Sequence, residues 1–389
     1  MAEVVLAPGR EGRILSGHVW VYDNQIQDVE GDVAPGDIVD VVTASGRHLG
    51  RGYYNPHSRI RVRLLTFEDE EIDRTFFAQR LDDALALRRR FYPMAQGVRL
   101  VFSEGDRLPG LIVDRFGDVV VVQFLTMGMD VRRKMWTELL IERLEPRAIV
   151  ERSDVPSRRL EGLDLRKGVL FGSLSGPVLF EENGLVFEAD VLEGQKTGFF
   201  LDQRENRQML RPLAPGARVL EAFCYTGSFA LFARAFGAER VVAIEQSHAA
   251  LQQARRNEAA NRLSGIEWVE ANAFDELRRL DQQHERFDLI ILDPPAFART
   301  RRSVEAALRG YKEINLRAWR MLRPGGFLVS CSCSQHVAPD QFFGVVAEAA
   351  DDARRVWRLI DSRTQAYDHP ILPAVPETLY LKCLVAQAL

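Results

Sequence analysis

A short apolar run, Phe287-Asp288-Leu289-Ile290-Ile291-Leu292, is followed directly by Asp293-Pro294-Pro295. An apolar run of this length that stops at a turn signal predicts a strand buried on both faces, as in a parallel sheet. The prolines cannot continue the ladder, and Pro294 disfavours a helical conformation at Asp293. We expect a carboxylate at the carboxyl edge of a central strand, where open α/β sheets bind ligands. A turn that only ends the strand is the alternative interpretation.

The sequence around this strand alternates between strand and helix patterns. Strands are expected at 218–220, 240–244, 266–269, 289–292 and 327–330, and helices at 229–236, 249–261, 275–280 and 304–322. Such alternation predicts a doubly wound, Rossmann-like α/β sheet, which we place in a domain spanning residues 194–389.

Two further domains are expected, because 389 residues are too many for one ordinary core. Residues 1–70 contain short strands punctuated by Gly and Pro, which predicts a small β-barrel or sandwich. Residues 75–190 begin with a helical pattern up to Arg90, continue with strands, and include a second helix at 129–144. This pattern indicates a compact α+β domain.

Composition narrows the class of protein. There is no apolar run long enough to span a bilayer and no basic, then apolar leader, so we expect a cytoplasmic protein without membrane contact. The four cysteines have no CxxC spacing, which predicts reduced thiols and no metal site.

Basic residues gather in the N-terminal half although the net charge is −4. The clusters are Arg59, Arg61 and Arg63, then Arg88 to Arg90, and then Arg152, Arg158, Arg159, Arg166 and Lys167. Each cluster alone is more often a solvated surface, but together they indicate a polyanion docking on this half.

Polar residues follow four successive strands of the expected α/β sheet: Glu221, Glu245, Asn272 and Asp293. The loop after the first strand contains Tyr225 and a single glycine, Gly227, where a dinucleotide site would need three. Glu245 is placed to bind both hydroxyls of a ribose, and Asn272 to bind an adenine edge. This layout predicts S-adenosyl-L-methionine in a class I methyltransferase, although each residue alone can equally be a helix cap.

Cys333 lies at the end of the next strand, beside the expected position of Asp293. Carbon 5 of a pyrimidine becomes nucleophilic when a thiolate adds to carbon 6, and a carboxylate hydrogen-bonded to the base stabilises the charge that forms. Cys333 and Asp293 are therefore candidates for catalysis, whereas Cys331 is expected to be a core residue. Phe297 offers a surface on which a base can stack.

The chain resembles the RlmI-like family of 23S ribosomal RNA cytosine-C5 methyltransferases, which have a PUA domain, a central α+β domain and a class I methyltransferase domain. The resemblance rests on residues 194–204, 223–230, 293–297, 311–315, 332–334, 368–370 and 380–382, with weaker matches at 20–22, 54–56, 152–154 and 161–162. It covers nearly the whole chain, and its most specific parts are the segment from Gly194 to Arg204 and the tripeptide Ser332-Cys333-Ser334.

The resemblance implies that Cys333 is the nucleophile, that Asp293 is its partner at the base, and that Gln203 and Arg204 reach the methionine end of the cofactor. It assigns the target base to Pro294, Pro295 and Phe297, and it implies 23S ribosomal RNA as partner and a homodimer. Ala296 follows Pro295 where related enzymes often carry a second cysteine. The base that removes the carbon 5 proton is therefore not identified.

Three other functions fit parts of the sequence. Enzymes that methylate an exocyclic amine of a purine use a similar Asp-Pro-Pro-aromatic motif and need no cysteine, so Cys333 alone separates that class. A non-catalytic RNA-binding assembly factor predicts no cofactor binding. A protein methyltransferase is disfavoured by the PUA-like first domain.

Overall fold

The computed structural model describes residues 2–298 and 300–389. The chain divides into two compact units. The first comprises Met1–Glu182, Ala189–Leu201 and Tyr367–Thr378, and the second comprises Asn183–Glu188, Asp202–Ala366 and Leu379–Leu389. The three domain ranges expected from the sequence stay a prediction. No described helix is both long enough and apolar enough to cross a membrane.

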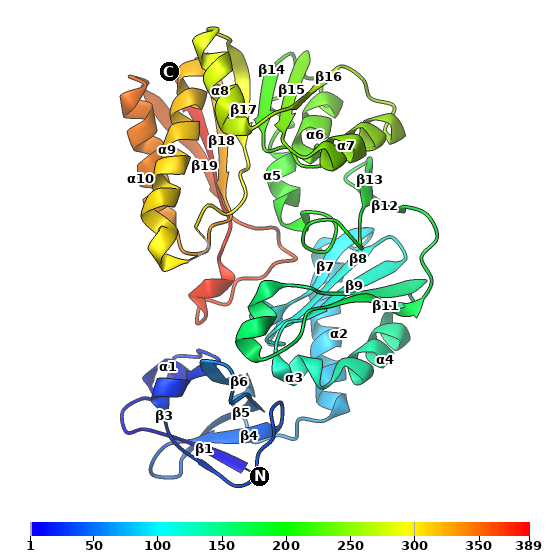
Figure 1. Ribbon diagram of the computed structural model, residues 1–389, viewed down its shortest axis with the longest axis vertical. Coiled ribbons are helices and arrows are strands. Elements are labelled where there is room, and N and C mark those ends of the chain that lie inside the picture. The colour runs from blue at the N-terminus through cyan, green and yellow to red at the C-terminus, as the bar shows by residue number, and fades with distance from the viewer. Residues whose placement is uncertain (1, 299) are drawn as a thin grey trace. The chain divides into compact units, whose positions relative to one another are not determined.

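The first sheet of unit 1 has six strands in the order β2-β6-β5-β4-β1-β3 (Figure 1). The strands are β1 (Ala2–Leu6), β2 (Trp20–Tyr22), β3 (Ile26–Glu30), β4 (Ile38–Val42), β5 (His48–Tyr54) and β6 (Ile60–Thr66), with a short helix α1 (Gly12–Leu15). Their alternate apolar residues, such as Val39, Val41, Val62 and Leu64, form a separate small core. The expected strand-rich N-terminal fold is confirmed.

The second sheet of unit 1 has the order β11-β10-β9-β8-β7. Its strands are β7 (Gly97–Phe102), β8 (Leu111–Phe116), β9 (Val119–Phe124), β10 (Ala148–Ser153) and β11 (Arg166–Gly172), and the helices are α2 (Arg74–Phe91), α3 (Met127–Asp130) and α4 (Arg133–Leu144). Helices α2 and α4 share one apolar core with the sheet. The single helix expected at 129–144 was wrong, since α3 and α4 are separate helices. Two further strands are β12 (Val178–Glu182) and β13 (Leu185–Ala189).

Several arginines expected on a basic surface are buried instead. Arg63 pairs with Glu161 at 2.8 Å, Arg88 with Asp106, Arg152 with Asp154, and Arg158 with Asp130 at 2.9 Å. A buried guanidinium is costly unless a carboxylate and hydrogen bonds satisfy it, so these residues belong to the interior of unit 1. The proposed polyanion surface loses these four members, while residues such as Arg59 stay exposed.

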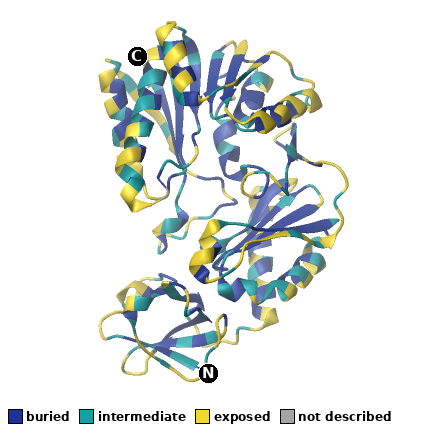
Figure 2. Ribbon diagram, viewed as in Figure 1, coloured by how far each residue is buried: buried dark blue, intermediate teal, exposed yellow. Residues whose placement is uncertain are grey.

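Unit 2 contains a seven-stranded sheet in the order β16-β15-β14-β17-β18-β20-β19. The strands are β14 (Arg218–Ala222), β15 (Arg240–Glu245), β16 (Ile266–Glu270), β17 (Phe287–Leu292), β18 (Leu322–Ser332), β19 (Trp357–Arg363) and β20 (Lys382–Ala388). Strands β14 to β18 are parallel, and β20 runs antiparallel to both of its neighbours. The predicted Rossmann-like sheet is confirmed, with β17 buried in its centre (Figure 2).

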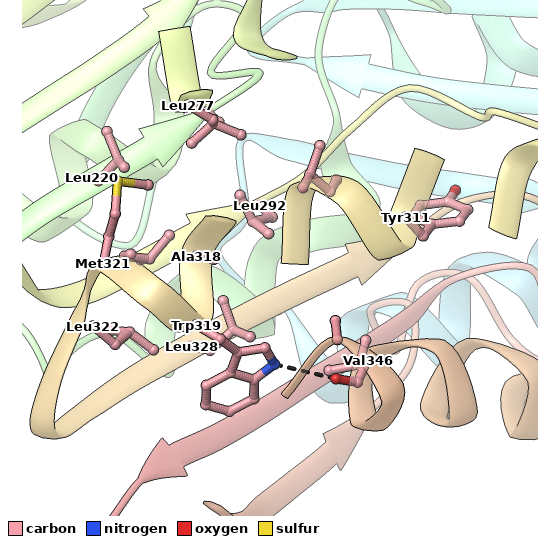
Figure 3. Packing of buried hydrophobic residues seen from close by; sticks show 14 of the residues in the cluster. Leu220, Leu277, Leu292, Tyr311, Ala318, Trp319, Met321, Leu322, Leu328 and Val346 are labelled. Carbon is pink, nitrogen blue, oxygen red and sulfur yellow. Dashed lines mark hydrogen bonds between the residues drawn. The ribbon is translucent and has the colours of Figure 1, made fainter. Parts of the chain in front are cut away.

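Helices cover this sheet. They are α5 (Arg204–Gln208), α6 (Ser228–Ala235), α7 (His248–Ala260), α8 (Ala273–Gln282), α9 (Val304–Met321) and α10 (Pro339–Asp352), of which α10 was not anticipated. Helices α8, α9 and α10 share one core with the sheet. Figure 3 shows its centre, where the Trp319 indole donates a hydrogen bond to the Val346 carbonyl at 3.2 Å. This packing supports the ends of β17 and β18, where the candidate site lies.

Candidate active site

The strand order of the unit 2 sheet reverses at β14, which pairs with β15 on one side and β17 on the other. Open α/β sheets bind ligands at the carboxyl ends of strands beside such a switch point. Glu221, Glu245, Asp293 and Cys333 lie at or near the carboxyl ends of β14, β15, β17 and β18. The structure therefore brings the predicted residues to one edge of one sheet.

Glu221 is almost completely buried, with 1% of its surface exposed. Its Oε2 accepts a hydrogen bond from the Ala230 backbone N–H at 2.7 Å, in the first turn of α6. Burial raises the pKa of Glu221 well above its usual value, and the negative charges of Asp293 and Glu245 raise it further. Glu221 thus organises the loop after β14 and also senses the other two carboxylates.

Glu245 fixes the same loop from the neighbouring strand. Its two carboxylate oxygens accept hydrogen bonds from the backbone N–H groups of Tyr225 at 3.0 Å and Ser247 at 2.9 Å. Tyr225 has a left-handed backbone conformation, with φ of 49°. Such strain in a residue with a side chain is common where a loop is shaped for a ligand.

Gly227 has a structural reason to be glycine. Its φ is 79°, and a Cβ at this position would lie 2.3 Å from the ring of Trp268. A side chain is therefore excluded by the protein itself, whether or not a cofactor lies nearby. The cofactor contact expected at Gly227 stays a prediction.

Asn272 is the N-cap of α8, because its Oδ1 accepts hydrogen bonds from the Phe274 N–H at 3.0 Å and the Asp275 N–H at 3.4 Å. The cap interpretation is confirmed for this residue. Its exposed amide nitrogen remains a donor, which is compatible with a contact to a ring nitrogen of adenine.

The donor set of this edge fits S-adenosylmethionine. Three carboxylates, Glu221, Glu245 and Asp293, are close enough to influence one another's charge, and Arg207 is the cation that opposes this effect on Glu221. A negative edge of this kind favours a ligand that carries a sulfonium and an ammonium group.

Gln203 lies next to Asp293 although 90 residues separate them along the chain. The Gln203 amide donates to Asp293 Oδ1 at 2.9 Å, and its own oxygen accepts from Asn206 at 2.6 Å. Both Gln203 and Arg204 are buried. Gln203 therefore fixes the orientation of the Asp293 carboxylate.

Cys333 lies directly beside the Asp-Pro-Pro turn. Its Sγ is 3.7 Å from the carbonyl oxygen of Pro294, and its side chain is partly exposed. Pro294 is buried and Pro295 is exposed, so the turn presents the second proline. Cys331, in contrast, is fully buried on β18 opposite Cys383, which confirms the expectation of a core residue.

The serines on either side of Cys333 are held by one tyrosine of α9. The Ser332 hydroxyl donates to the Tyr311 hydroxyl at 2.9 Å, and Tyr311 and Ser334 are also hydrogen-bonded at 2.9 Å. Ser334 Oγ in turn accepts from the Ala298 N–H at 3.1 Å. The two serines are drawn inward, while the cysteine between them stays accessible.

Lys382 lies beneath the same segment. Its Nζ donates to the carbonyl oxygens of Ser334 at 2.7 Å and Tyr380 at 2.9 Å, and only 6% of the residue is exposed. Burial lowers the pKa of Lys382 to about 8, and the charge of Cys333 acts in the opposite direction. The sequence analysis gave Tyr311 and Lys382 no function, although both occur in the segments that carry the resemblance.

Phe297 is partly buried. Its ring centroid is 4.7 Å from that of Tyr311 and 5.6 Å from that of Phe274. Much of the ring is therefore used in packing, and its stacking on a target base stays a prediction.

Comparison with known proteins agrees with this site. Residues 173–385 match the profile of S-adenosylmethionine-dependent methyltransferases, and residues 4–67 match that of PUA-like domains. Two solved structures share the fold over 100% of both chains: a methyltransferase complexed with SAH (TM-score 0.87, 20% identity) and one from Streptococcus mutans (TM-score 0.85, 19% identity). The protein is a Rossmann-like methyltransferase that uses S-adenosylmethionine and carries an N-terminal PUA-like domain.

Full-length relatives give the family. The ribosomal RNA large subunit methyltransferase I of Shewanella denitrificans is 44% identical, with 99% of this chain and 98% of the relative covered. That of Aeromonas hydrophila is 41% identical over 100% and 99%. The chain belongs to the ribosomal RNA large subunit methyltransferase I family.

Proposed function

We propose that the protein methylates carbon 5 of a cytosine in 23S ribosomal RNA through a covalent bond between Cys333 Sγ and carbon 6. The observation that carries the proposal is the position of Cys333, partly exposed at the carboxyl edge with Sγ 3.7 Å from the Pro294 carbonyl. A methyltransferase acting on an exocyclic amine has no use for a thiol there. The names of the relatives, together with the PUA-like domain, support ribosomal RNA as substrate and the cytoplasm as the place of action.

In this mechanism the Cys333 thiolate adds to carbon 6, which places electron density on carbon 5. Asp293, oriented by Gln203, hydrogen-bonds the edge of the base and stabilises the charge that develops. S-adenosylmethionine, when bound, supplies an electrophilic methyl group. After carbon 5 gains the methyl group and loses its proton, the bond from Sγ to carbon 6 breaks and the thiolate is regenerated.

The remaining residues hold the two ligands. We assign the ribose to Glu245, the adenine edge to Asn272, and the methionine end to Gln203, Arg204 and Asp293. Tyr225 and Gly227 line the loop that Glu221 holds in place. The base is assigned to Pro294, Pro295 and Phe297.

Mass-spectrometric mapping of nucleosides in ribosomal RNA tests the proposal. We expect one 5-methylcytidine in 23S RNA to be absent from cells that lack the protein. Wild-type protein should restore it, and Cys333→Ala should not. Loss of a methylated purine, or full restoration by Cys333→Ala, would overturn the proposal.

A further inference from the structure

Lys382 is a buried cation placed at the foot of the cysteine segment. It begins β20 and pairs across the sheet with Ser332, the residue before Cys333. Its ammonium binds the carbonyl oxygen of Ser334, the residue after Cys333. Among residues 2–298 and 300–389, no carboxylate forms an ion pair with Lys382, so two neutral carbonyls are its acceptors. A buried amine without a carboxylate partner exchanges its proton easily.

The other titratable groups around Cys333 do not supply a cation. Tyr311 of α9 faces the cysteine segment, and burial raises its pKa to about 12. The neighbouring thiol of Cys383 and burial raise the pKa of Cys331 well above its usual range. Asp293, at the end of β17, carries a negative charge and therefore opposes a thiolate nearby. Lys382 is the group whose charge favours one, and its interaction with the charge of Cys333 raises its own pKa.

We propose that Lys382 is the proton partner of Cys333: its neutral amine takes the proton of the thiol, and the resulting ammonium stabilises the thiolate. The S–H bond breaks and an N–H bond forms, with no other reactant. When the thiolate adds to carbon 6 and later leaves, the same cation faces the sulfur in both steps. This inference rests on the proposed function of Cys333, and Lys382 acts through that residue rather than on the base.

Alkylation of Cys333 by iodoacetamide, measured between about pH 5.5 and about pH 10, tests the pair without RNA or cofactor. Peptide mass spectrometry separates Cys333 from the buried cysteines. In the wild-type protein we expect a midpoint below about 8.5, the usual pKa of a free thiol. Lys382→Met should move the midpoint upward by about one pH unit or more, because the cation is lost.

Two further variants separate charge from structure. Lys382→Arg should keep the midpoint low, since its charge does not titrate in this range. Lys134→Met, which removes an exposed lysine on α4, should leave the profile unchanged.

Equal midpoints in the wild type and Lys382→Met would overturn the inference. If Lys382→Met does not fold, a wild-type midpoint at or above about 8.5 overturns it alone. These results are independent of the RNA mapping, so a normal pairing without 5-methylcytidine would refute only the proposed function.

Discussion

Two parts of the same sheet edge are built differently. At the ends of β14, β15 and β16, the polar side chains bind backbone near their own strands or loops: Glu221 binds the first turn of α6, Glu245 binds two loop N–H groups, and Asn272 caps α8. At the ends of β17 and β18, the side chains bind partners far along the chain, as Gln203 binds Asp293 and Lys382 binds the carbonyl of Ser334. We call these parts the cofactor edge and the cysteine edge.

The difference separates shape from reactivity. The cofactor edge uses side chains to fix loops, so changes there should alter affinity for the cofactor and stability. The cysteine edge assembles a nucleophile, a carboxylate and a cation from separate segments, so changes there should alter the rate of the chemical step. The following variants test this division, beginning with the largest effect.

Cys333→Ala should lower the rate of methyl transfer by about a thousandfold or more, because the nucleophile is lost. Binding of S-adenosylmethionine, measured by calorimetry, should change little. A fully active variant would contradict the covalent mechanism, and Cys383→Ala serves as the matched control for a cysteine that is buried away from the turn.

Asp293→Asn should lower kcat by about a hundredfold, since a carboxylate that stabilises developing charge is replaced by an amide. Single-turnover kinetics with saturating RNA and cofactor measure this effect. An effect confined to cofactor affinity would move Asp293 from the cysteine edge to the cofactor edge.

Glu245→Gln should weaken cofactor binding by about tenfold with kcat nearly unchanged, because an amide cannot accept from both the Tyr225 and Ser247 N–H groups. Calorimetric titration gives the affinity. Glu267→Gln, on β16 and paired with Arg240 on the outside, is the control that should bind normally. A large loss of kcat at unchanged affinity would erase the proposed difference between the two edges.

Tyr311→Phe should lower kcat several-fold and the free energy of unfolding by about 1 kcal/mol, since the hydroxyl that joins Ser332 and Ser334 is removed. Denaturant unfolding and steady-state kinetics report the two effects. Unchanged kinetics would show that Tyr311 contributes only to packing.

Glu221→Gln should have the smallest effect on the reaction but should change the pH dependence of stability. The raised pKa of Glu221 means that its contribution to stability is present below the usual carboxyl pKa and is lost as the pH rises toward the raised value. Thermal unfolding should therefore show a smaller loss of Tm between about pH 5 and about pH 8 in the variant than in the wild type. Parallel losses would place the titration elsewhere.

Much of the cofactor edge could be predicted from sequence because strand ends and caps are local features. Glu221, Glu245 and Asn272 each follow a recognisable strand. The basic clusters misled because burial is not local: Arg158 has the same sequence signature as an exposed arginine, yet it is buried with Asp130. Lys382 gained significance only when β20 paired with β18 and brought residues 332 and 382 together.

The most direct test of the central claim is trapping of the covalent bond. Ribosomal RNA containing 5-fluorocytidine cannot lose a proton from carbon 5, so after methyl transfer the enzyme should stay bonded to carbon 6. Incubation with S-adenosylmethionine, digestion and mass spectrometry should find the nucleotide on the peptide that contains Cys333. Methylation of unmodified RNA without any adduct on Cys333 would contradict the account.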